Sequence, residues 1–281
     1  MKNAWHFVDS IFFALTVFLV GGIALVPSAA MAAAEKPNVV NVVAKEYSYQ
    51  MPSTIPAGPT LFHLTDNGNQ LHHVTLVKLE DGKTLTDFTS LPPGPFPKWA
   101  VFMGGPNTPT PKGGQDEDIV DLTPGNYAVI CVIPDTDGKP HMMKGMVKAL
   151  TVTPSKVART MPASDLTLTL TNYKFTFSKP VTAGQHEIRV INKGTQPHEA
   201  VMFRLNKGKK GADIANWVGG GMKGPPPAAP VTGITPESPG KENILPVNLS
   251  PGSYALLCFM PDAKDGKPHA MHGMIYDFDV M

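Results

Sequence analysis

The chain is short of cysteine, since its 281 residues include only Cys131 and Cys258. In an oxidising compartment one disulfide between them is the simplest interpretation. Both cysteines, however, lie in equivalent apolar strand segments, NYAVICVI and SYALLCFM, and joining them would require two separate cores to meet. We therefore expect two unpaired thiols, and metal ligation explains them better than a disulfide does.

Charge is also scarce, with 17% charged residues and a formal net charge of +1. This balance, without any nucleic-acid-binding motif, predicts no nucleic-acid partner. Two short runs of like charge, at residues 207–210 and at Asp116, Glu117 and Asp118, are interpreted as solvated surface. The 42% hydrophobic content is sufficient for two cores of roughly a hundred residues each.

Long helical segments are missing because 29 prolines and 26 glycines interrupt the chain. Segments such as LTLTLTNYKFTF (166–177) alternate apolar and polar residues with the period of a β-strand. About six or seven such strands in each half suit a Greek-key β-sandwich. Short helices are expected only at 84–91 and 211–218, and the long Pro- and Gly-rich connections that follow are expected to cover the site end of each sandwich.

The first 34 residues have the pattern of a secretory signal peptide. Lys2 precedes an apolar run from Ile11 to Val26, and an Ala-x-Ala cleavage motif ends at Ala34. The run is shorter than a typical bilayer span, so we expect cleavage, export to the periplasm or the outside, and no membrane span in the mature protein. An uncleaved N-terminal membrane anchor is the alternative, because Asp9 offsets the charge of Lys2.

The chain repeats itself at a nearly constant spacing. The segment DNGNQLHHVTLVKL (66–79) aligns with NKGTQPHEAVMFRL (192–205), and TPGNYAVIC (123–131) aligns with SPGSYALLC (250–258). Such a repeat indicates one duplicated domain. The predicted organisation is a signal peptide at 1–34, a first domain at 35–154, a linker at 155–164 and a second domain at 165–281.

Each copy contains the same candidate metal ligands in the same order: His72, Cys131, His141 and Met146 in the first copy, and His198, Cys258, His269 and Met274 in the second. A thiolate, two imidazoles and a thioether are the donors of a mononuclear redox copper site. Any one of these residues alone would be an ordinary polar or core residue. Their order, repeated twice, predicts one copper ion in each copy and up to two in the chain.

Two further histidines adjoin proposed ligands. His73 follows His72, and His272 lies between His269 and Met274. We interpret both first as ordinary surface residues, and second as groups that support a ligand or bind a further ion.

Both copies resemble cupredoxins, the type 1 or blue copper domains of the plastocyanin and azurin kind, from about Val39 to Thr153 and from Leu166 to Val280. The stretches YSYQMPSTIPAG and YKFTFSKPVTAG add to the resemblance. It implies an all-β fold of two tandem cupredoxin-like Greek-key sandwiches, with the eight residues above as copper ligands. One departure is the spacing from Cys to the second His, which exceeds that of small blue copper carriers and is comparable with that of copper nitrite reductases.

The sequence thus predicts an exported copper-binding protein that carries single electrons to or from an unidentified redox partner protein. One alternative is a periplasmic copper chaperone or copper-resistance protein that delivers Cu(I) to an acceptor, favoured by HMMKGM and HAMHGM. Another is a metal-free β-sandwich binding module. Multicopper oxidases and nitrite reductases resemble duplicated cupredoxins, but the chain has no His-x-His pair, and it is therefore expected not to be an enzyme.

Overall fold

The computed structural model describes residues 35–281 except 93 and 108–109, and these residues belong to one compact unit. The segment predicted as a signal peptide, 1–34, lies outside the described residues. No helix in the described part of the chain is long and apolar enough to cross a membrane. The fold is all-β, as predicted, with strands making up most of the regular structure.

The first half contains these elements in chain order: β1 (Asn38–Lys45), β2 (Ser48–Gln50), β3 (Thr54–Pro56), β4 (Gly58–Asp66), β5 (Thr75–Leu79), α1 (Leu85–Thr89), β6 (Ala100–Gly104), β7 (Gly114–Leu122), β8 (Gly125–Ile130), the 3-10 helix η1 (His141–Lys144) and β9 (Val147–Thr153). The helix α1 begins at an N-cap, Thr84, whose side chain accepts a hydrogen bond from the backbone N–H of Asp87. The short helix predicted at 84–91 is therefore present.

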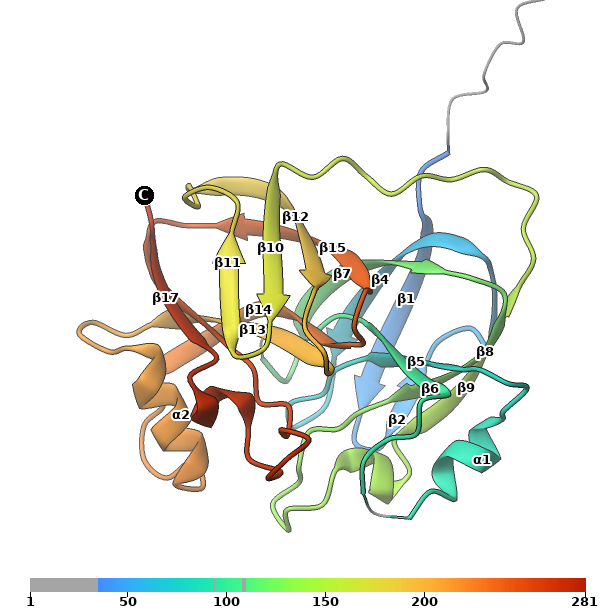
Figure 1. The fold of residues 1–281 in the computed structure, drawn as a ribbon, viewed down its shortest axis with the longest axis horizontal. Coiled ribbons are helices and arrows are strands. Elements are labelled where there is room, and N and C mark those ends of the chain that lie inside the picture. The colour runs from blue at the N-terminus through green and yellow to red at the C-terminus, as the bar shows by residue number, and fades with distance from the viewer. Residues whose placement is uncertain (1–34, 93, 108–109) are drawn as a thin grey trace, which may run out of the picture. The chain divides into compact units, whose positions relative to one another are not determined.

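The second half repeats this order: β10 (Leu166–Thr171), β11 (Lys174–Phe177), β12 (Gly184–Asn192), β13 (His198–Leu205), α2 (Gly211–Gly219), β14 (Ala228–Glu237), β15 (Glu242–Leu249), β16 (Gly252–Leu257), the 3-10 helix η2 (His269–His272) and β17 (Ile275–Val280). In Figure 1 the strands β10, β11 and β12 lie side by side, as their pairing requires. Their buried residues alternate with more exposed ones along β10 and β12, which is the pattern of strands with one face in a core.

The strands form two sheets, and each sheet contains strands of both halves. One has the order β11-β10-β12-β15-β7-β4-β1-β2, and the other the order β17-β16-β13-β14-β6-β5-β8-β9-β3. Apart from β3, equivalent strands follow one another in mirrored order on the two sides of the junction. The sequence repeat predicted two sandwiches, but it did not predict that their sheets would be continuous. The predicted domain boundaries themselves stay a prediction.

The junction between the halves buries carboxyl groups. At this junction β7 pairs with β15 and β6 with β14. Asp116 and Asp118 on β7 and Glu237 on β14 are buried. The interpretation of the run at Asp116, Glu117 and Asp118 as solvated surface is therefore wrong for both aspartates. Alternate residues of a strand face opposite sides, so Asp116 and Asp118 point inward while Glu117 is partly exposed and contacts His63.

The long connections contain more regular structure than the sequence predicted. Residues of the first connection form β6, which pairs with β5, and residues of the second form β14, which pairs with β13. The expectation that these connections are irregular covers is wrong for both segments. The strands β6 and β14 pair with their neighbours over a short length or with register shifts, and Pro and Gly residues adjoin both strands. The alternation of apolar and polar residues is therefore weak in these two segments.

Each half has its own apolar core. Phe62, Leu64 and Tyr127 belong to the core of the first half, and Phe175 and Tyr254 to that of the second. The two tyrosines are equivalent, and each hydroxyl donates a hydrogen bond of 2.8 Å to a carbonyl oxygen four residues earlier. This contact holds the turn before β8 and before β16 and so fixes the strand that leads to the cysteine.

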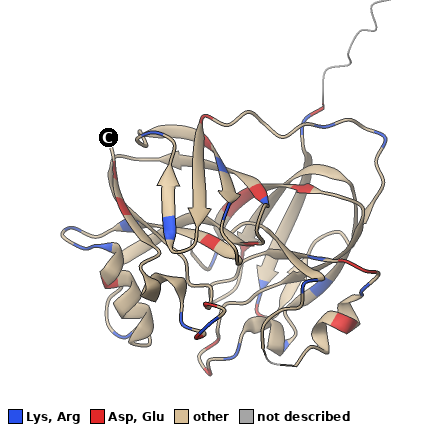
Figure 2. Ribbon diagram, viewed as in Figure 1, with Lys and Arg blue, Asp and Glu red and all other residues tan. Residues whose placement is uncertain are grey.

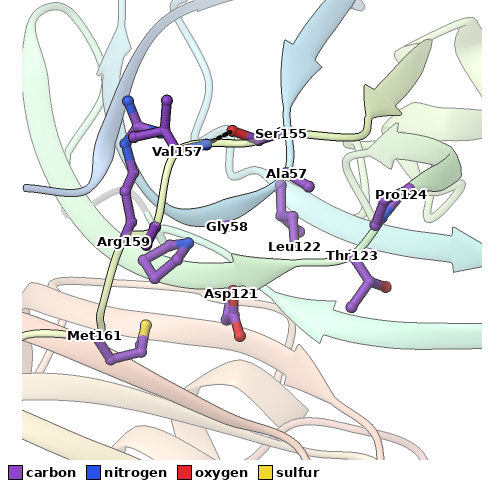
Figure 3. Close-up of a pocket in the computed structure, with 12 residues that line it drawn as sticks. Ala57, Gly58, Asp121, Leu122, Thr123, Pro124, Ser155, Val157, Arg159 and Met161 are labelled. Carbon is purple, nitrogen blue, oxygen red and sulfur yellow. Dashed lines mark hydrogen bonds between the residues drawn. The ribbon is translucent and has the colours of Figure 1, made fainter. Parts of the chain in front are cut away.

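Charged residues of both signs are interspersed along the described chain (Figure 2), in keeping with its near-neutral balance. An open pocket lies where the start of β4, the turn between β7 and β8, and the segment after β9 meet (Figure 3). Ala57, Asp121, Ser155, Arg159 and Met161 are among its lining residues, which include no histidine or cysteine. The candidate ligands therefore lie elsewhere.

Candidate metal centres

The structure brings the predicted histidines and cysteines together in two separate groups. One contains His72, Cys131 and His141, and the other His198, Cys258 and His269. In each group one ligand atom from every residue lies within 4.8 Å of the others, and all six side chains are fully buried. Residues far apart in the sequence thus converge twice in the same way.

Each ligand residue comes from an equivalent place in its half. His72 lies in the connection between β4 and β5. His198 follows the equivalent connection after β12 and is the first residue of β13. Cys131 and Cys258 directly follow β8 and β16. His141 and His269 begin η1 and η2, so the paired strands hold the cysteine while a short helical turn presents the second histidine.

The inner nitrogen atoms of the histidines face one another. The Nδ1 atoms of His72 and His141 are 3.1 Å apart, and those of His198 and His269 are 3.0 Å apart. The cysteine Sγ lies 3.5 Å from Nδ1 of His141 in the first half and 3.3 Å from Nδ1 of His269 in the second. Two imidazole nitrogens at this distance need a shared proton or a metal ion between them, because two lone pairs would repel.

Outer contacts fix which nitrogen faces inward. Nε2 of His141 lies 3.2 Å from the amide oxygen of Gln70, and Nε2 of His198 lies 3.2 Å from that of Asn172. An oxygen acceptor at Nε2 places the proton of the neutral ring there and leaves Nδ1 free to bind a metal. Both contacts therefore support ligation through Nδ1.

Burial sets the protonation states of these groups. It lowers the pKa of His72, His141 and His269, and it lowers that of His198 to about 4. The imidazoles are consequently neutral at neutral pH, which is the form that ligates metals. Burial also raises the pKa of the Cys131 thiol to about 12 and raises that of Cys258. A metal ion that binds the sulfur must displace this proton.

The predicted axial methionines are tied to the same groups by the backbone. Met146 is fully buried, its N–H donates to the carbonyl of His141 (3.1 Å), and its carbonyl accepts from the N–H of Cys131 (3.3 Å). Met274 is also buried and makes the equivalent bonds to His269 (3.0 Å) and Cys258 (3.4 Å). Each methionine therefore enters the core in which its cysteine lies.

The long loop between cysteine and second histidine does not displace the histidine. In the first half Pro134 bridges Pro140, and the N–H of Asp135 donates to Lys139, so the additional residues form a closed turn. Pro261 and Pro268 make the equivalent bridge in the second half. The additional residues between the cysteine and the second histidine therefore form a turn outside the ligand group, and the histidine still lies beside the cysteine.

Glycine is required beside the first histidine of each site. A Cβ atom on Gly68 would lie 2.6 Å from the ring of His72, and one on Gly194 would lie 2.5 Å from Nε2 of His198. The side chain of Asp66 accepts the N–H groups of both Gly68 and His72 at 2.9 Å, which fixes the turn. The equivalent residues DNG and NKG therefore hold the histidine ring from its outer side.

Two side chains secure the cysteine strand: His73, for which support of a ligand was the second interpretation from the sequence, and Glu199, which sequence reasoning missed. The N–H of Val132 donates to Nε2 of His73 (2.9 Å), and the N–H of Phe259 donates to Oε1 of Glu199 (2.7 Å). His73 is buried, so its interpretation as a surface residue is wrong. Burial lowers the pKa of His73 to about 3 and raises that of Glu199 to about 7. The sequence did contain a signal for these two residues, because they occupy equivalent positions directly after His72 and His198.

Two tyrosines cover the second histidine of each site and were also missed. The rings of Tyr47 and His141 meet edge to face at 5.4 Å, and those of Tyr173 and His269 at 5.5 Å. The Tyr47 hydroxyl donates to Asp135, and that of Tyr173 donates to Asp262. Both tyrosines have positive φ angles, 57° and 64°, and they occur at matching places in the repeated YSYQ and YKFTF stretches.

Comparison with known proteins gave matches among solved structures only. No protein-family model matches the chain, and no curated protein matches it. A reduced auracyanin from Roseiflexus castenholzii is 19% identical, with a TM-score of 0.30, over 43% of this chain and 100% of its own. A copper nitrite reductase from Nitrosomonas europaea is 12% identical, with a TM-score of 0.25, over 88% of this chain and 94% of its own.

Each half is a β-sandwich of the kind that its resemblance to cupredoxins implied. The predicted fold class is confirmed, and the paired sheets, the tyrosine contact at the cysteine strand and the converging His-Cys-His groups occur in both halves. Function does not follow from identities and TM-scores this low.

The expectation that the chain is not an enzyme is corrected by the same comparison. Similar solved structures include a multicopper oxidase, 13% identical with a TM-score of 0.24, and a laccase, besides the copper nitrite reductases. These proteins are enzymes, and the exclusion of enzymatic activity is therefore withdrawn. The lack of a His-x-His pair was too weak a ground for the exclusion, because it tests only one arrangement of additional copper ligands.

Proposed function

We propose that this chain is an exported copper protein that holds one type 1 copper ion in each cupredoxin-like half and passes single electrons between partner proteins. The observation that carries the proposal is the buried convergence of two histidine Nδ1 atoms and one cysteine Sγ, repeated in both halves. Copper, when bound, supplies the one-electron couple between Cu(I) and Cu(II). His72, Cys131 and His141 would hold it in the first half, with Met146 as a weaker fourth ligand.

The residues around the ligands suit this role. The imidazoles are neutral, the cysteine follows a strand paired on both sides, and the tyrosine and aspartate contacts restrict the second histidine. A donor set that is held in place changes little between the two oxidation states, and this favours rapid electron transfer. Burial of all six side chains also excludes water from the ligand group.

The first test is the copper content and visible spectrum of the oxidised protein. We expect close to two copper ions per chain and an intense thiolate-to-copper band. Cys131→Ser and Cys258→Ser should each remove the band of one half, and the double variant should remove it entirely. A band that survives in the double variant would contradict the assignment of the cysteines.

Methionine variants provide a matched test of the axial position. Met274 is fully buried beside the site, whereas Met271, three residues earlier, is 63% exposed. Met274→Leu should keep copper bound and shift the reduction potential of the second site, since only the weak ligand is lost. Met271→Leu should leave that potential unchanged. Equal shifts in both variants would exclude Met274 as the axial ligand.

A second candidate function is delivery of Cu(I) to an acceptor. Met143 is 64% exposed and Met271 is 63% exposed, at equivalent places on η1 and η2, in each case two positions after the second histidine. Exposed thioethers suit capture of Cu(I). Transfer of bound Cu(I) to a soluble chelator, slowed in the Met143→Leu/Met271→Leu double variant, would favour delivery over electron transfer.

Export belongs to the same proposal and rests on the N-terminal pattern alone. Cleavage after Ala34 would leave Glu35 as the first residue of the mature protein. Intact-mass measurement of protein recovered from the periplasm or the medium tests this directly. A mass that includes residues 1–34 would instead indicate a retained N-terminal anchor.

A further inference from the structure

A third group of potential metal ligands lies in the second half, outside the buried donor sets. Asp262, Asp265 and His272 offer one ligand atom each within 4.8 Å of one another. They come from the loop between Cys258 and Met274, where Asp262 is buried and the other two reach the surface. Nε2 of His272 lies 3.1 Å from Oδ1 of Asp265.

In the first half the equivalent loop contains a lysine, whose positive charge faces the two carboxylates. Its equivalent residues are Asp135, Asp137 and Lys144. The Lys144 ammonium group contacts Asp135 and lies 3.1 Å from Asp137, so one positive charge satisfies two carboxylates. In the second half a histidine replaces this lysine. The imidazole brings a nitrogen that can ligate a metal ion to the two carboxylates, where the first half has an ammonium group.

We propose that Asp262, Asp265 and His272 bind a divalent transition-metal ion of the Zn²⁺ type at a site distinct from the buried donor set. Two carboxylates and one imidazole are ligands that Zn²⁺ accepts, with solvent completing its coordination. Exposure of Asp265 and His272 gives the ion access from solvent. The site goes beyond the proposed copper function and does not depend on it.

The inner carboxylate is positioned for this role. Oδ2 of Asp262 accepts hydrogen bonds from the Tyr173 hydroxyl and from Nε2 of Gln196 (2.9 Å), and Oδ1 accepts from the N–H of Lys264 (2.8 Å). A carboxylate has about four lone-pair sites, so one remains for a metal ion. These contacts hold the carboxylate at the base of the cluster, as partners of a metal ligand do.

A second observation points into the same cluster. Nε2 of His269 is buried, has no hydrogen-bond partner among the described residues, and lies 3.8 Å from Oδ2 of Asp262. Lys267 is a competing cation, because its Nζ lies 3.6 Å from Oδ2 of Asp265, but its side chain is 60% exposed to solvent. The cluster therefore combines three ligands, an uncompensated charge and an unpartnered nitrogen at its inner end.

Zinc titration of matched variants tests the site. His272→Lys gives the second half the lysine of the first half, so the loop should keep its fold while losing the metal ligand. His63→Lys is the control, because His63 also contacts a carboxylate, Glu117 at 2.7 Å, but belongs to none of the candidate ligand groups found among the described residues. Beyond any zinc taken up by the buried donor sets, calorimetric titration with Zn²⁺ alone should give one further binding event in the original protein and in His63→Lys, and this event should be weakened at least about tenfold in His272→Lys.

Zinc taken up by the buried donor sets does not affect this comparison, because all three proteins keep those sets. Equal zinc binding by the full-length protein and His272→Lys would overturn the site. Equal weakening in His63→Lys and His272→Lys would also overturn it, since it would show nonspecific binding to surface histidines.

Discussion

Replacement of Glu237 should change how stability depends on pH. Glu237 is fully buried on β14 at the junction of the halves, and both of its carboxylate oxygens lack a hydrogen-bond partner among the described residues. Burial, and then the neighbouring charge of Asp118, raises the pKa of Glu237 well above 4.5. The folded protein therefore keeps this carboxyl group protonated at a pH where the unfolded chain has released the proton.

The sign and size of the effect follow from this difference. Above pH 4.5 and below the folded pKa, the folded state binds one more proton than the unfolded state, so a rise in pH favours unfolding. The free energy of unfolding falls by about 1.4 kcal/mol for each pH unit in this window because of Glu237 alone. Glu237→Gln removes this titrating group. For each pH unit in the window, the free energy of unfolding of the variant should therefore rise by about 1.4 kcal/mol relative to that of the original protein.

The assay is denaturant unfolding at about pH 5.5 and about pH 6.5, with equal metal content in both proteins. Glu80→Gln, a change at an exposed carboxylate, is the control and should keep the original pH dependence. A difference between Glu237→Gln and the original protein that is the same at both pH values would refute the reasoning. It would show that Glu237 is already ionised in the folded state.

Three further predictions concern the sites. Tyr254→Phe should lower the free energy of unfolding by about 1 kcal/mol, measured with denaturant, because the bond to the Ser250 carbonyl is lost. Gly194→Ala should weaken copper uptake in the second half at least about tenfold, since its Cβ would meet His198, whereas Gly219→Ala, with open space around it, should not. Copper affinity, measured by chelator competition, should rise about tenfold per pH unit near neutrality, because binding displaces the Cys131 proton while the histidines are already neutral.

Much of the candidate site was predictable because its residue types repeat in a fixed order. The cysteines directly follow strands whose apolar pattern is clear, and they lie close to the histidines of the same copy. The supporting residues were not predictable in the same way. Tyr47 contacts Asp135 from 88 residues away, and His73 accepts a bond from Val132. Both contacts join distant segments, so the only signal for them in the sequence was that these residues stand at matching places in the two copies.

The sequence by itself determined the β class, the duplication and the two sets of metal-binding residue types. These follow from strand periodicity, from a constant offset between copies and from donor chemistry, all of which are local or repeated properties. Only the tertiary structure decided that the sheets continue from one half into the other, so that Asp118 and Glu237 are buried. It also decided which nitrogen of each histidine faces inward. Strand pairing across the junction and ring orientation depend on contacts between distant segments, and the local pattern of a chain does not contain them.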